Sequence, residues 1–225
     1  MTKLKLSKRL SLIANLVDKE SILADIGCDH ALLDIYLTNN NIVKKSVACD
    51  ITKGAIDNAK KNIKLYNAKN IDVRLGDGLN VINSDDNIDT LVISGMGNQT
   101  IANILKENIN KLDNINTIII QSNTGYDKVR NDIINLGYYI SDEVLVKENK
   151  IIYEIMKFKK GHKKYSKKQI TFGPILLKNK NELFKEIITS QINKNSTIIK
   201  KLPKKKFIKK IKLIIENIKL KKEIH

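Results

Sequence analysis

The sequence predicts an α/β fold with a seven-stranded, mainly parallel sheet, followed by a C-terminal helical hairpin. Strand-length apolar runs alternate with helical patterns five times before residue 137. Two β runs then follow with only Lys147-Glu-Asn-Lys150 between them, which indicates an antiparallel hairpin. Beyond about residue 180 the apolar residues recur only at helical spacing. Such alternation is typical of parallel sheets that carry helices on their faces.

The individual elements follow from apolar spacing and from residues that begin or end helices. Thr52 is placed to cap the helix that follows the second strand, and Asn98 or Thr100 to cap the helix after the fourth. Gly137 is placed to adopt the left-handed conformation after the helix that follows the fifth strand. The expected order is helix 6–17, strand 22–25, helix 31–38, strand 46–50, helix 54–66, strand 71–75, strand 88–94, a helix ending near residue 109, strand 117–121, helix 126–136, and β runs 138–146 and 151–158.

Acidic residues and glycines follow three of these strands where each one ends. Asp25 and Gly27 follow the first strand, Asp50 ends the second, and the pair Asp77 and Gly78 follows the third. The carboxyl ends of parallel strands meet at one edge of a sheet, so we expect one nucleoside-sized ligand there. Asp50 lies 23 residues after Gly27, about where nucleotide-binding folds place a carboxylate for the ribose hydroxyls. Asp77 can accept a hydrogen bond from the amino group of an adenine.

The residues after Gly27 distinguish between two nucleoside cofactors. A dinucleotide such as NAD needs Gly-x-Gly-x-x-Gly for close backbone approach to its pyrophosphate, but here Gly27 is followed by Cys28, Asp29, His30 and Ala31. Carboxylates at Asp25 and Asp29 repel phosphates and favour a cation. S-adenosylmethionine carries adenine and ribose with an ammonium and a sulfonium in place of phosphate, so it is the predicted cofactor.

Charge divides the chain into two predicted domains. Residues 1–156 have a net charge of −1, whereas residues 157–225 contain 22 lysines and four glutamates, a net charge of +18. We therefore expect a cofactor-binding domain over residues 1–158 and a basic helical domain over residues 159–225. An excess of positive charge confined to one part of the chain is the electrostatic signature of a polyanion-binding protein.

The basic part of the chain is predicted to be a helical hairpin. Pro203 interrupts a helical apolar pattern, which predicts two antiparallel helices packed along a coiled-coil-like seam. On the second helix the predicted seam residues are Phe207, Ile208, Ile211, Ile214, Ile215 and Ile218. Lysines gather at the connecting turn, where we expect them to bind RNA phosphates: Lys200, Lys201, Lys204, Lys205, Lys206, Lys209 and Lys210.

The two cysteines and the hydropathy limit the cellular context. Cys28 and Cys49 have no metal-ligand spacing and are predicted to be buried free thiols, and we expect no metal. No apolar run approaches the roughly 18 residues that a membrane span requires, and the start lacks the apolar core of a signal peptide. We expect a cytoplasmic protein, most simply a monomer.

Five motifs along the chain resemble those of the TrmK family of bacterial tRNA methyltransferases. They are Ser7-Lys-Arg-Leu10, Asp25-Ile-Gly-Cys-Asp-His-Ala31, Ser94-Gly-Met-Gly97, Gln121-Ser-Asn123 and Phe172-Gly-Pro-Ile-Leu176. The chain departs from the family pattern at Cys28, Leu32, Asp34 and Asn98, where Thr, Tyr, Pro and Gly are expected. The resemblance implies a class I Rossmann-like methyltransferase core with a C-terminal α-helical coiled-coil hairpin. It further implies methylation of N1 of adenine 22 in tRNA with S-adenosylmethionine.

Roles can be proposed for individual residues. We expect Asp29 to be the catalytic carboxylate, with His30 orienting it, Met96 lining the reaction centre and Arg9 positioning an RNA phosphate. The residues expected to bind the cofactor are Asp25, Gly27, Asp29, Asp50, Ile51, Asp77, Gly78, Gly95 and Gly97. N1 lies on the Watson–Crick edge, so the target adenine must be unpaired or extruded.

Two alternatives remain open at this stage. A methyltransferase acting on another RNA or on a small molecule would keep every cofactor residue. A non-catalytic RNA-binding protein on the same fold would keep the basic hairpin but would not need Asp25, Asp50 and Asp77.

Overall fold

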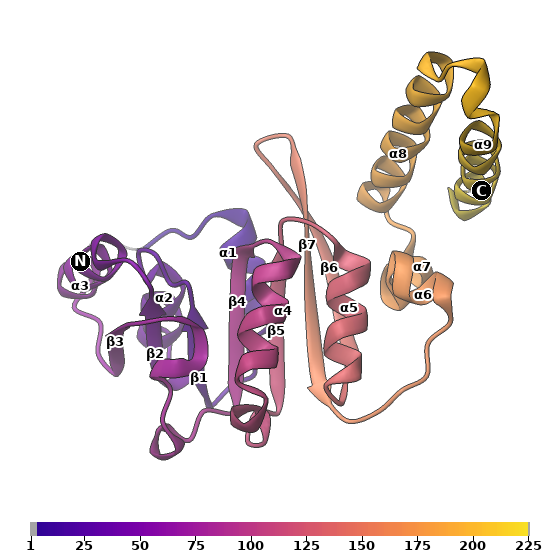
Figure 1. The fold of residues 1–225 in the computed structure, drawn as a ribbon. Coiled ribbons are helices and arrows are strands. Elements are labelled where there is room, and N and C mark those ends of the chain that lie inside the picture. The colour runs from indigo at the N-terminus through magenta and orange to yellow at the C-terminus, as the bar shows by residue number, and fades with distance from the viewer. Residues whose placement is uncertain (1–3, 225) are drawn as a thin grey trace. The chain divides into compact units, whose positions relative to one another are not determined.

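The computed structural model describes residues 4–224, except the side chain of Lys204, and it divides into two compact units that meet between Thr171 and Phe172. The first unit is an α/β domain and the second is helical (Figure 1). The first unit therefore extends past residue 158, where the charge pattern alone places the boundary.

A seven-stranded sheet, counted over the described residues, forms the centre of the first unit. Its order is β3-β2-β1-β4-β5-β7-β6, and within it β7 runs antiparallel to its neighbours β5 and β6 (Figure 1). Leu23, Leu91 and Ile120 of the central strands are fully buried. This arrangement confirms the predicted, mainly parallel sheet. The strands are β1 Ser21–Ile26, β2 Val43–Asp50, β3 Ile71–Leu75, β4 Thr90–Met96, β5 Thr117–Ser122, β6 Tyr138–Glu148 and β7 Ile151–Lys160.

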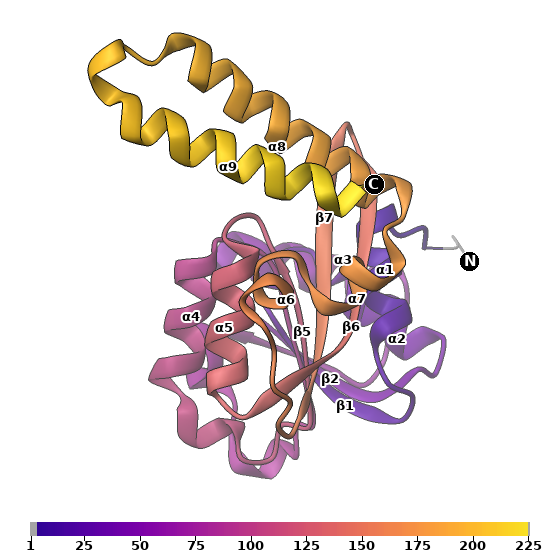
Figure 2. The same ribbon diagram turned by 90° about the vertical axis from the view of Figure 1, so that its right-hand side faces the viewer.

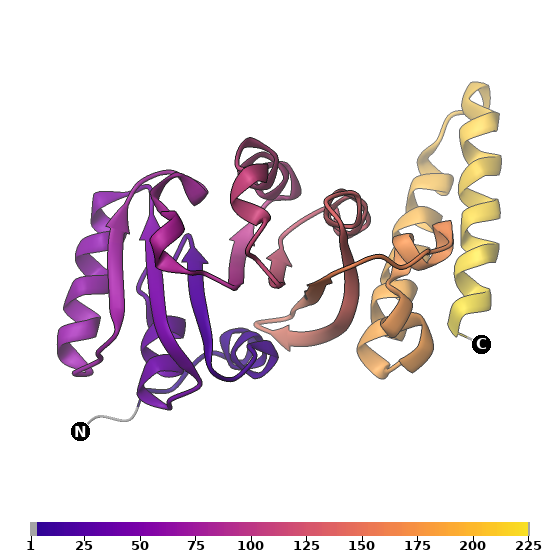
Figure 3. The same cartoon turned by 90° about the horizontal axis from the view of Figure 1, so that it is seen from below.

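Helices cover both faces of the sheet. One face carries α1 Lys8–Leu16, α2 Leu32–Asn39 and α3 Lys53–Leu65; the other carries α4 Asn98–Glu107 and α5 Tyr126–Asn135 (Figures 2 and 3). Short 3₁₀ turns lie at η1 Gly78–Val81, η2 Ser84–Asp86 and η3 Ile109–Leu112.

The predicted helix ends agree with the structure in two places and differ in one. The Thr52 hydroxyl accepts the N–H of Ala55 at 3.3 Å, and Gly137 has φ +89° after α5, as predicted. At α4 the N-cap residue is Gly97, with no side-chain cap, so the prediction of Asn98 or Thr100 as the cap is wrong. The side chain of Asn98 instead accepts a hydrogen bond from Thr124 at 3.1 Å.

The segment after β7 remains attached to the first unit. The Tyr165 hydroxyl accepts the N–H of Ile140 at 2.9 Å, and Nη1 of Arg130 donates to the carbonyl of Ile170 at 3.3 Å. Helix α6, Lys167–Phe172, crosses the boundary between the units. These contacts are the physical reason why the first unit ends at Thr171 rather than at residue 158.

The second unit contains α7 Pro174–Asn179, α8 Glu182–Lys201, η4 Lys204–Lys206 and α9 Phe207–Ile224. Helices α8 and α9 form the predicted antiparallel hairpin, with its turn at Leu202 and Pro203.

The prediction of which α9 residues form the seam with α8 is wrong. All six have at least 41% of their surface exposed, and α9 instead buries Asn217, Leu220 and Glu223. Asn195 of α8 donates to Asn217 at 3.0 Å, and Asn217 donates to the hydroxyl of Ser196 at 3.2 Å. A buried amide must keep its partners, so this pair fixes the rotation of α9 about its axis and turns the isoleucines outward.

Within residues 4–224, the helices are all too short or too polar to span a bilayer.

Candidate active site

The candidate active site is a cavity of about 340 Å³ at the carboxyl ends of β1, β2 and β4. Strands β1 and β4 are the adjacent central strands from which the strand order proceeds in opposite directions. Ligands of open α/β sheets bind at this switch point because the loops after the two strands diverge there. The predicted residues that line the cavity are Arg9, Asp25, Gly27, Asp29, His30, Asp50, Gly95 and Met96.

Gly27 allows Met96 to close over the turn after β1. Gly27 has φ +80°, and a Cβ atom there would stand 2.4 Å from Cε of Met96. The N–H groups of Gly27 and Cys28 both donate to the carbonyl of Cys49 at 2.9 Å. The turn is thereby tied to β2, and its left-handed backbone conformation favours glycine.

Asp25 is a buried carboxyl on the cavity wall that faces a second buried carboxyl, Asp34, in the first turn of α2. Burial, and next the charge of Asp34, raises the pKa of Asp25 well above its usual range. Burial also raises the pKa of Asp34, although hydrogen bonds from Ser46 and Asp25 oppose the shift. Two such carboxyls do not both ionise near neutral pH.

Asp50 organises the two loops at the mouth of the cavity. Its Oδ1 accepts the N–H and the hydroxyl of Thr52 at 2.9 and 3.0 Å, and its Oδ2 accepts the N–H of Asp29 at 3.3 Å. Asp29 has φ +49° and an exposed side chain, and its Oδ2 lies 3.4 Å from Nε2 of His30. The predicted catalytic carboxylate and its predicted partner are therefore neighbours.

Arg9 of α1 reaches the wall of the cavity beside the end of β4. Its Nη1 donates to Oε1 of Gln121 and to Oγ of Ser94, and its guanidinium lies 5.4 Å from the ring centre of Tyr153. Oε1 of Gln121 also accepts the N–H of Gly95 at 3.1 Å. Gly95 has φ +81° and lies where the register of β4 and β5 shifts, a bulge that directs the following residue toward the cavity.

The chain matches a family model over residues 23–223, the model of tRNA (adenine(22)-N(1))-methyltransferase, TrmK. This chain belongs to the TrmK family. The resemblance drawn from the five sequence motifs is confirmed, and the architecture agrees with the core and hairpin that it implies.

Individual TrmK relatives cover nearly the whole chain. The tRNA (adenine(22)-N(1))-methyltransferase of Bacillus subtilis is 32% identical over 209 residues, which are 90% of this chain and 87% of that protein. A Streptococcus pneumoniae protein solved in complex with S-adenosyl-L-methionine has a TM-score of 0.91 at 30% identity, covering 98% of this chain and 100% of its own. TrmK of M. capricolum in complex with S-adenosyl-homocysteine has a TM-score of 0.87 at 32% identity, covering 97% of each chain.

Four residues predicted to bind the cofactor of this TrmK protein do not line the cavity. Ile51 follows Asp50 and is 65% exposed. Asp77 precedes η1 and makes no capping bond, whereas the carbonyl of Gly78 accepts the thiol of Cys49 at 3.5 Å. Gly97 follows Met96 at the start of α4.

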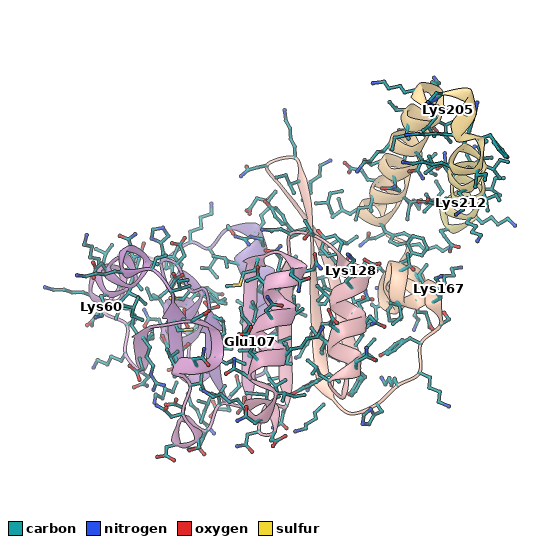
Figure 4. All side chains as sticks on the ribbon, viewed as in Figure 1. Lys60, Glu107, Lys128, Lys167, Lys205 and Lys212 are labelled. Carbon is teal, nitrogen blue, oxygen red and sulfur yellow. The ribbon has the colours of Figure 1, made fainter. Side chains whose placement is uncertain are left out.

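The predicted RNA-binding lysines belong to the other unit. They lie at the end of α8, in η4 and at the start of α9, and Lys205 marks the turn in Figure 4. Lys200, Lys201, Lys205, Lys206, Lys209 and Lys210 are exposed, whereas the side chain of Lys204 lies outside the described part of the structure.

Sequence reasoning missed three residues that shape the site: Asp34, Gln121 and Tyr153. Gln121 belongs to a family motif, so a signal existed, although no role followed from it. Asp34 and Tyr153 carry no local signal of a function, because each reaches the site from an element with its own helix or strand pattern. Within residues 4–224 there is no group of three His, Cys, Asp or Glu side chains suited to a metal ion.

Proposed function

We propose that this chain transfers the methyl group of S-adenosylmethionine to N1 of adenine 22 in tRNA, and that the cavity between β1 and β4 is where the transfer occurs. The observation that carries the proposal is the acid-lined cavity of a TrmK family member, closed on one side by the glycine bulge of β4. Two TrmK-like structures hold S-adenosyl-L-methionine and S-adenosyl-homocysteine, which supports the same cofactor here.

The residues present fit such a cofactor. Asp25, Asp29 and Asp50 surround the cavity with carboxylates, while Arg9 is the one lysine or arginine among the described residues that line it. This balance of charge suits an ammonium and a sulfonium better than phosphates. Asp25 would bind the ammonium and Asp50 the ribose hydroxyls, because Oδ2 of Asp50, which accepts the N–H of Asp29, keeps a second lone pair.

The adenine of the cofactor would lie beyond Asp50. Asp77, at the end of β3, makes no capping bond with its carboxylate, which is able to accept the exocyclic amino group, and Ile51 offers an exposed apolar surface to the ring. The buried backbone of Gly78 and the backbone of Gly97 would border the site on either side.

Bound S-adenosylmethionine supplies a methyl carbon already activated by its sulfonium, so the protein needs no strong base before attack. Met96 and Gly95 would hold the target ring against that carbon and exclude water. Asp29 would stabilise the positive charge that develops on the methylated adenine, with His30 fixing the orientation of its carboxylate. Arg9 would use its remaining N–H groups to position a phosphate of the nucleotide.

Affinity for tRNA would come from the lysines at the turn of the α8–α9 hairpin. Contacts to phosphates position a protein on nucleic acid but carry little sequence information, so selection of the tRNA would follow its shape. Because tRNA is a cytoplasmic substrate, we expect the protein to act in the cytoplasm, and one chain, acting as a monomer without a metal ion, supplies every residue named here.

Methyl transfer from labelled S-adenosylmethionine to unmodified tRNA transcripts tests this function. Transfer to a transcript with adenine at position 22, and none when position 22 is guanine, is the expected result. Transfer that persists with guanine would move the target to another nucleotide. Binding of the cofactor without any transfer would instead favour another RNA, a small-molecule acceptor, or an RNA-binding protein without activity.

A further inference from the structure

Another cavity of the first unit has no part in the proposed chemistry. It has a volume of about 590 Å³ and lies between α4, α5 and the segment 165–171. All the residues that line it precede Phe172, so it belongs to the first unit alone. Its volume is in the range of sites that hold small ligands, which is large enough for a nucleotide. We call this cavity the α4–α5 groove.

The α4–α5 groove lies directly beside the reaction centre. Met96 lines the cofactor cavity, and Asn98, two residues further along the chain, lines the groove. Thr124 donates its hydroxyl to Oδ1 of Asn98 at 3.1 Å, and the adjacent Asn123 donates to the carbonyl of Gly95 at 2.7 Å. Two residues span at most about 7 Å of chain. A strand of RNA whose target base enters the cavity would therefore pass close to the groove.

Two lysines of the groove have no ion-pair partner among the described residues. Lys128 of α5 and Lys167 of α6 are both exposed, and Figure 4 labels both. Lys106 of α4 differs, because its Nζ lies 3.0 Å from Oδ1 of Asp132. Asp127 lies in the first turn of α5, where its carboxylate is able to accept a ribose 2′-hydroxyl. The two available cations suit the phosphates of a nucleic acid.

The uncharged groups of the groove suit a nucleobase. Amide side chains, which can donate to and accept from base edges, come from Asn98, Gln99 and Asn131. The ring of Tyr165 is half-buried, and it is held in place because its hydroxyl accepts the N–H of Ile140 at 2.9 Å. Unstacked RNA bases are commonly bound on such aromatic rings.

The segment that leads into the groove adds positive charge. Residues 162–168 read His-Lys-Lys-Tyr-Ser-Lys-Lys, and both Lys163 and Lys164 are exposed. Nζ of Lys163 lies 4.1 Å from the ring centre of Tyr139. Lysines interspersed with aromatic rings are typical of surfaces that bind single-stranded nucleic acid. The surroundings of the groove therefore favour RNA as its ligand.

We propose that the α4–α5 groove binds the tRNA nucleotides that flank the target adenine, with Lys128 and Lys167 on their phosphates and Tyr165 against a base. This inference rests on the proposed function, which supplies both the RNA and the target adenine. Enzymes that extrude a base select their substrate partly through contacts to the neighbouring nucleotides. The lysines of the hairpin would bind the tRNA as a whole, whereas the groove holds the strand beside the reaction centre.

The double variant Lys128→Gln/Lys167→Gln removes both cations without changing the cofactor cavity. In filter binding, tRNA affinity should fall at least about fivefold, and the slope of log K against log salt should flatten by roughly 0.7 for each phosphate of a single strand. Affinity for S-adenosyl-homocysteine in calorimetry should remain that of the wild type. The charge-matched control is Lys61→Gln/Lys69→Gln, which replaces two exposed lysines in and just after α3, on the other face of the sheet.

A photo-crosslinker in the groove identifies the nucleotides that it meets. Asn131 is exposed on α5 and both native cysteines are buried, so Asn131→Cys can be labelled at one site with benzophenone maleimide. Irradiation with tRNA should give crosslinks at the nucleotides beside the methylated adenine. The same label on Lys61→Cys is the control and should not reach these nucleotides. If the label at position 131 alone prevents tRNA binding, it occupies the groove in place of the RNA, which also supports the proposal.

Crosslinks beside the methylated adenine, together with a loss of affinity and slope in the Lys128→Gln/Lys167→Gln variant alone, support the proposal. It is overturned if the crosslinks lie in another arm of the tRNA, if this variant binds tRNA as the wild type does, or if the control variant loses as much affinity. Methyl transfer by the wild type is measured first. Its absence would refute the proposed function and this proposal together, whereas the other three results refute the role of the groove alone.

Discussion

Met96 covers Gly27 so closely that a Cβ atom at position 27 would stand 2.4 Å from Cε of Met96. The contact joins the end of β4 to the turn after β1 across the switch point of the sheet. One glycine thus determines both the backbone of the cofactor turn and the position of a residue at the reaction centre.

Gly27→Ala should therefore displace Met96 and strain the turn. Alanine at φ +80° costs roughly 1–2 kcal/mol, and Cε, the flexible end of the Met96 side chain, must shift to make room for the new Cβ atom. We expect at least a tenfold loss of S-adenosylmethionine affinity in calorimetry, with loss of methyl transfer. The matched control is Gly54→Ala in α3, where a Cβ atom meets nothing within 4 Å. Equal affinities for the two variants would show that the close approach of Met96 has no role in binding.

Gln121 holds the end of β4 in place and should matter more for turnover than for cofactor binding. It is fully buried, and its Oε1 accepts hydrogen bonds from Arg9 and from the N–H of Gly95. In Gln121→Leu these donors lose their partner and the bulge at Gly95 relaxes. We expect kcat to fall about 10²-fold with S-adenosylmethionine affinity within about threefold, as for other misplaced reaction centres. The control is Gln99→Leu, because Gln99 is exposed and bonds to Asn103 on its own helix; a larger effect on affinity than on kcat would contradict this role.

Asp29 can be tested without straining its backbone. Asp29→Asn keeps a residue that tolerates φ +49° while it removes the carboxylate charge beside His30. If the carboxylate stabilises the charge that develops on adenine, kcat should fall at least about tenfold with little change in S-adenosylmethionine affinity. Kinetics measure kcat and calorimetry on the same preparation measures S-adenosylmethionine affinity. Losses of equal size in kcat and in affinity would make Asp29 a cofactor ligand only.

Glu154 predicts how the stability of the first unit depends on pH. Arg130 binds both Glu143 and Glu154 in the core, and burial raises the pKa of Glu154 from 4.5 to about 7 despite the charge of Arg130. Between these values the folded protein holds a proton that the unfolded chain has released. The free energy of unfolding should therefore decrease as pH rises through this range and level off above it.

The variant Glu154→Gln should reduce that decrease, because the amide still accepts from Arg130 but does not titrate. All seven tyrosines precede residue 172 and the chain has no tryptophan, so tyrosine fluorescence in urea reports on the first unit alone. Glu107→Gln changes an exposed carboxyl and is the control. A free energy of unfolding of the wild type that rises between pH 4.5 and about 7 would contradict the raised pKa of Glu154.

The order of helices and strands along the chain, and most of the cavity, could be predicted from the sequence. Asp25, Gly27 and Asp50 could be placed because parallel strands end at one edge, a rule that needs no side-chain detail. Gly95 and Met96 could be placed at the same edge of the sheet, because they end the parallel strand β4. The close approach of Met96 to Gly27 could not be predicted, because it depends on how far the register shift moves β4 toward β1.

The features that were not predicted correctly from the sequence depend on the rotation of helices about their axes. Asp34 has the spacing of an ordinary first-turn acid, and only the packing of α2 on the sheet places it against Asp25. In the hairpin, Ile214 and Ile218 lie on the face of α9 with the apolar spacing of a buried helix face. The Asn195–Asn217 hydrogen bond nevertheless turns another face of α9 inward. Hydrophobic periodicity indicates the existence of a helix more reliably than the direction of its faces.

The lysines at the hairpin turn provide the test of the proposed tRNA surface. Replacing Lys205, Lys206, Lys209 and Lys210 by Gln removes four exposed charges without shortening the chain. If they bind phosphates, tRNA affinity should fall, and the slope of log K against log salt should flatten by roughly one for each phosphate that is no longer neutralised. The charge-matched control replaces four exposed lysines of α3 in the first unit, Lys53, Lys60, Lys61 and Lys64.

Filter binding at several salt concentrations measures the tRNA affinity and its salt dependence for both sets of variants. The affinity for S-adenosyl-homocysteine is the check that the cavity is intact. We expect the hairpin set to lose affinity and slope, the α3 set to retain both, and cofactor affinity to stay constant in each. If the α3 set caused the same loss, the basic charge would act only through the overall field of the protein. An unchanged slope for the hairpin set would place the tRNA surface elsewhere on the chain.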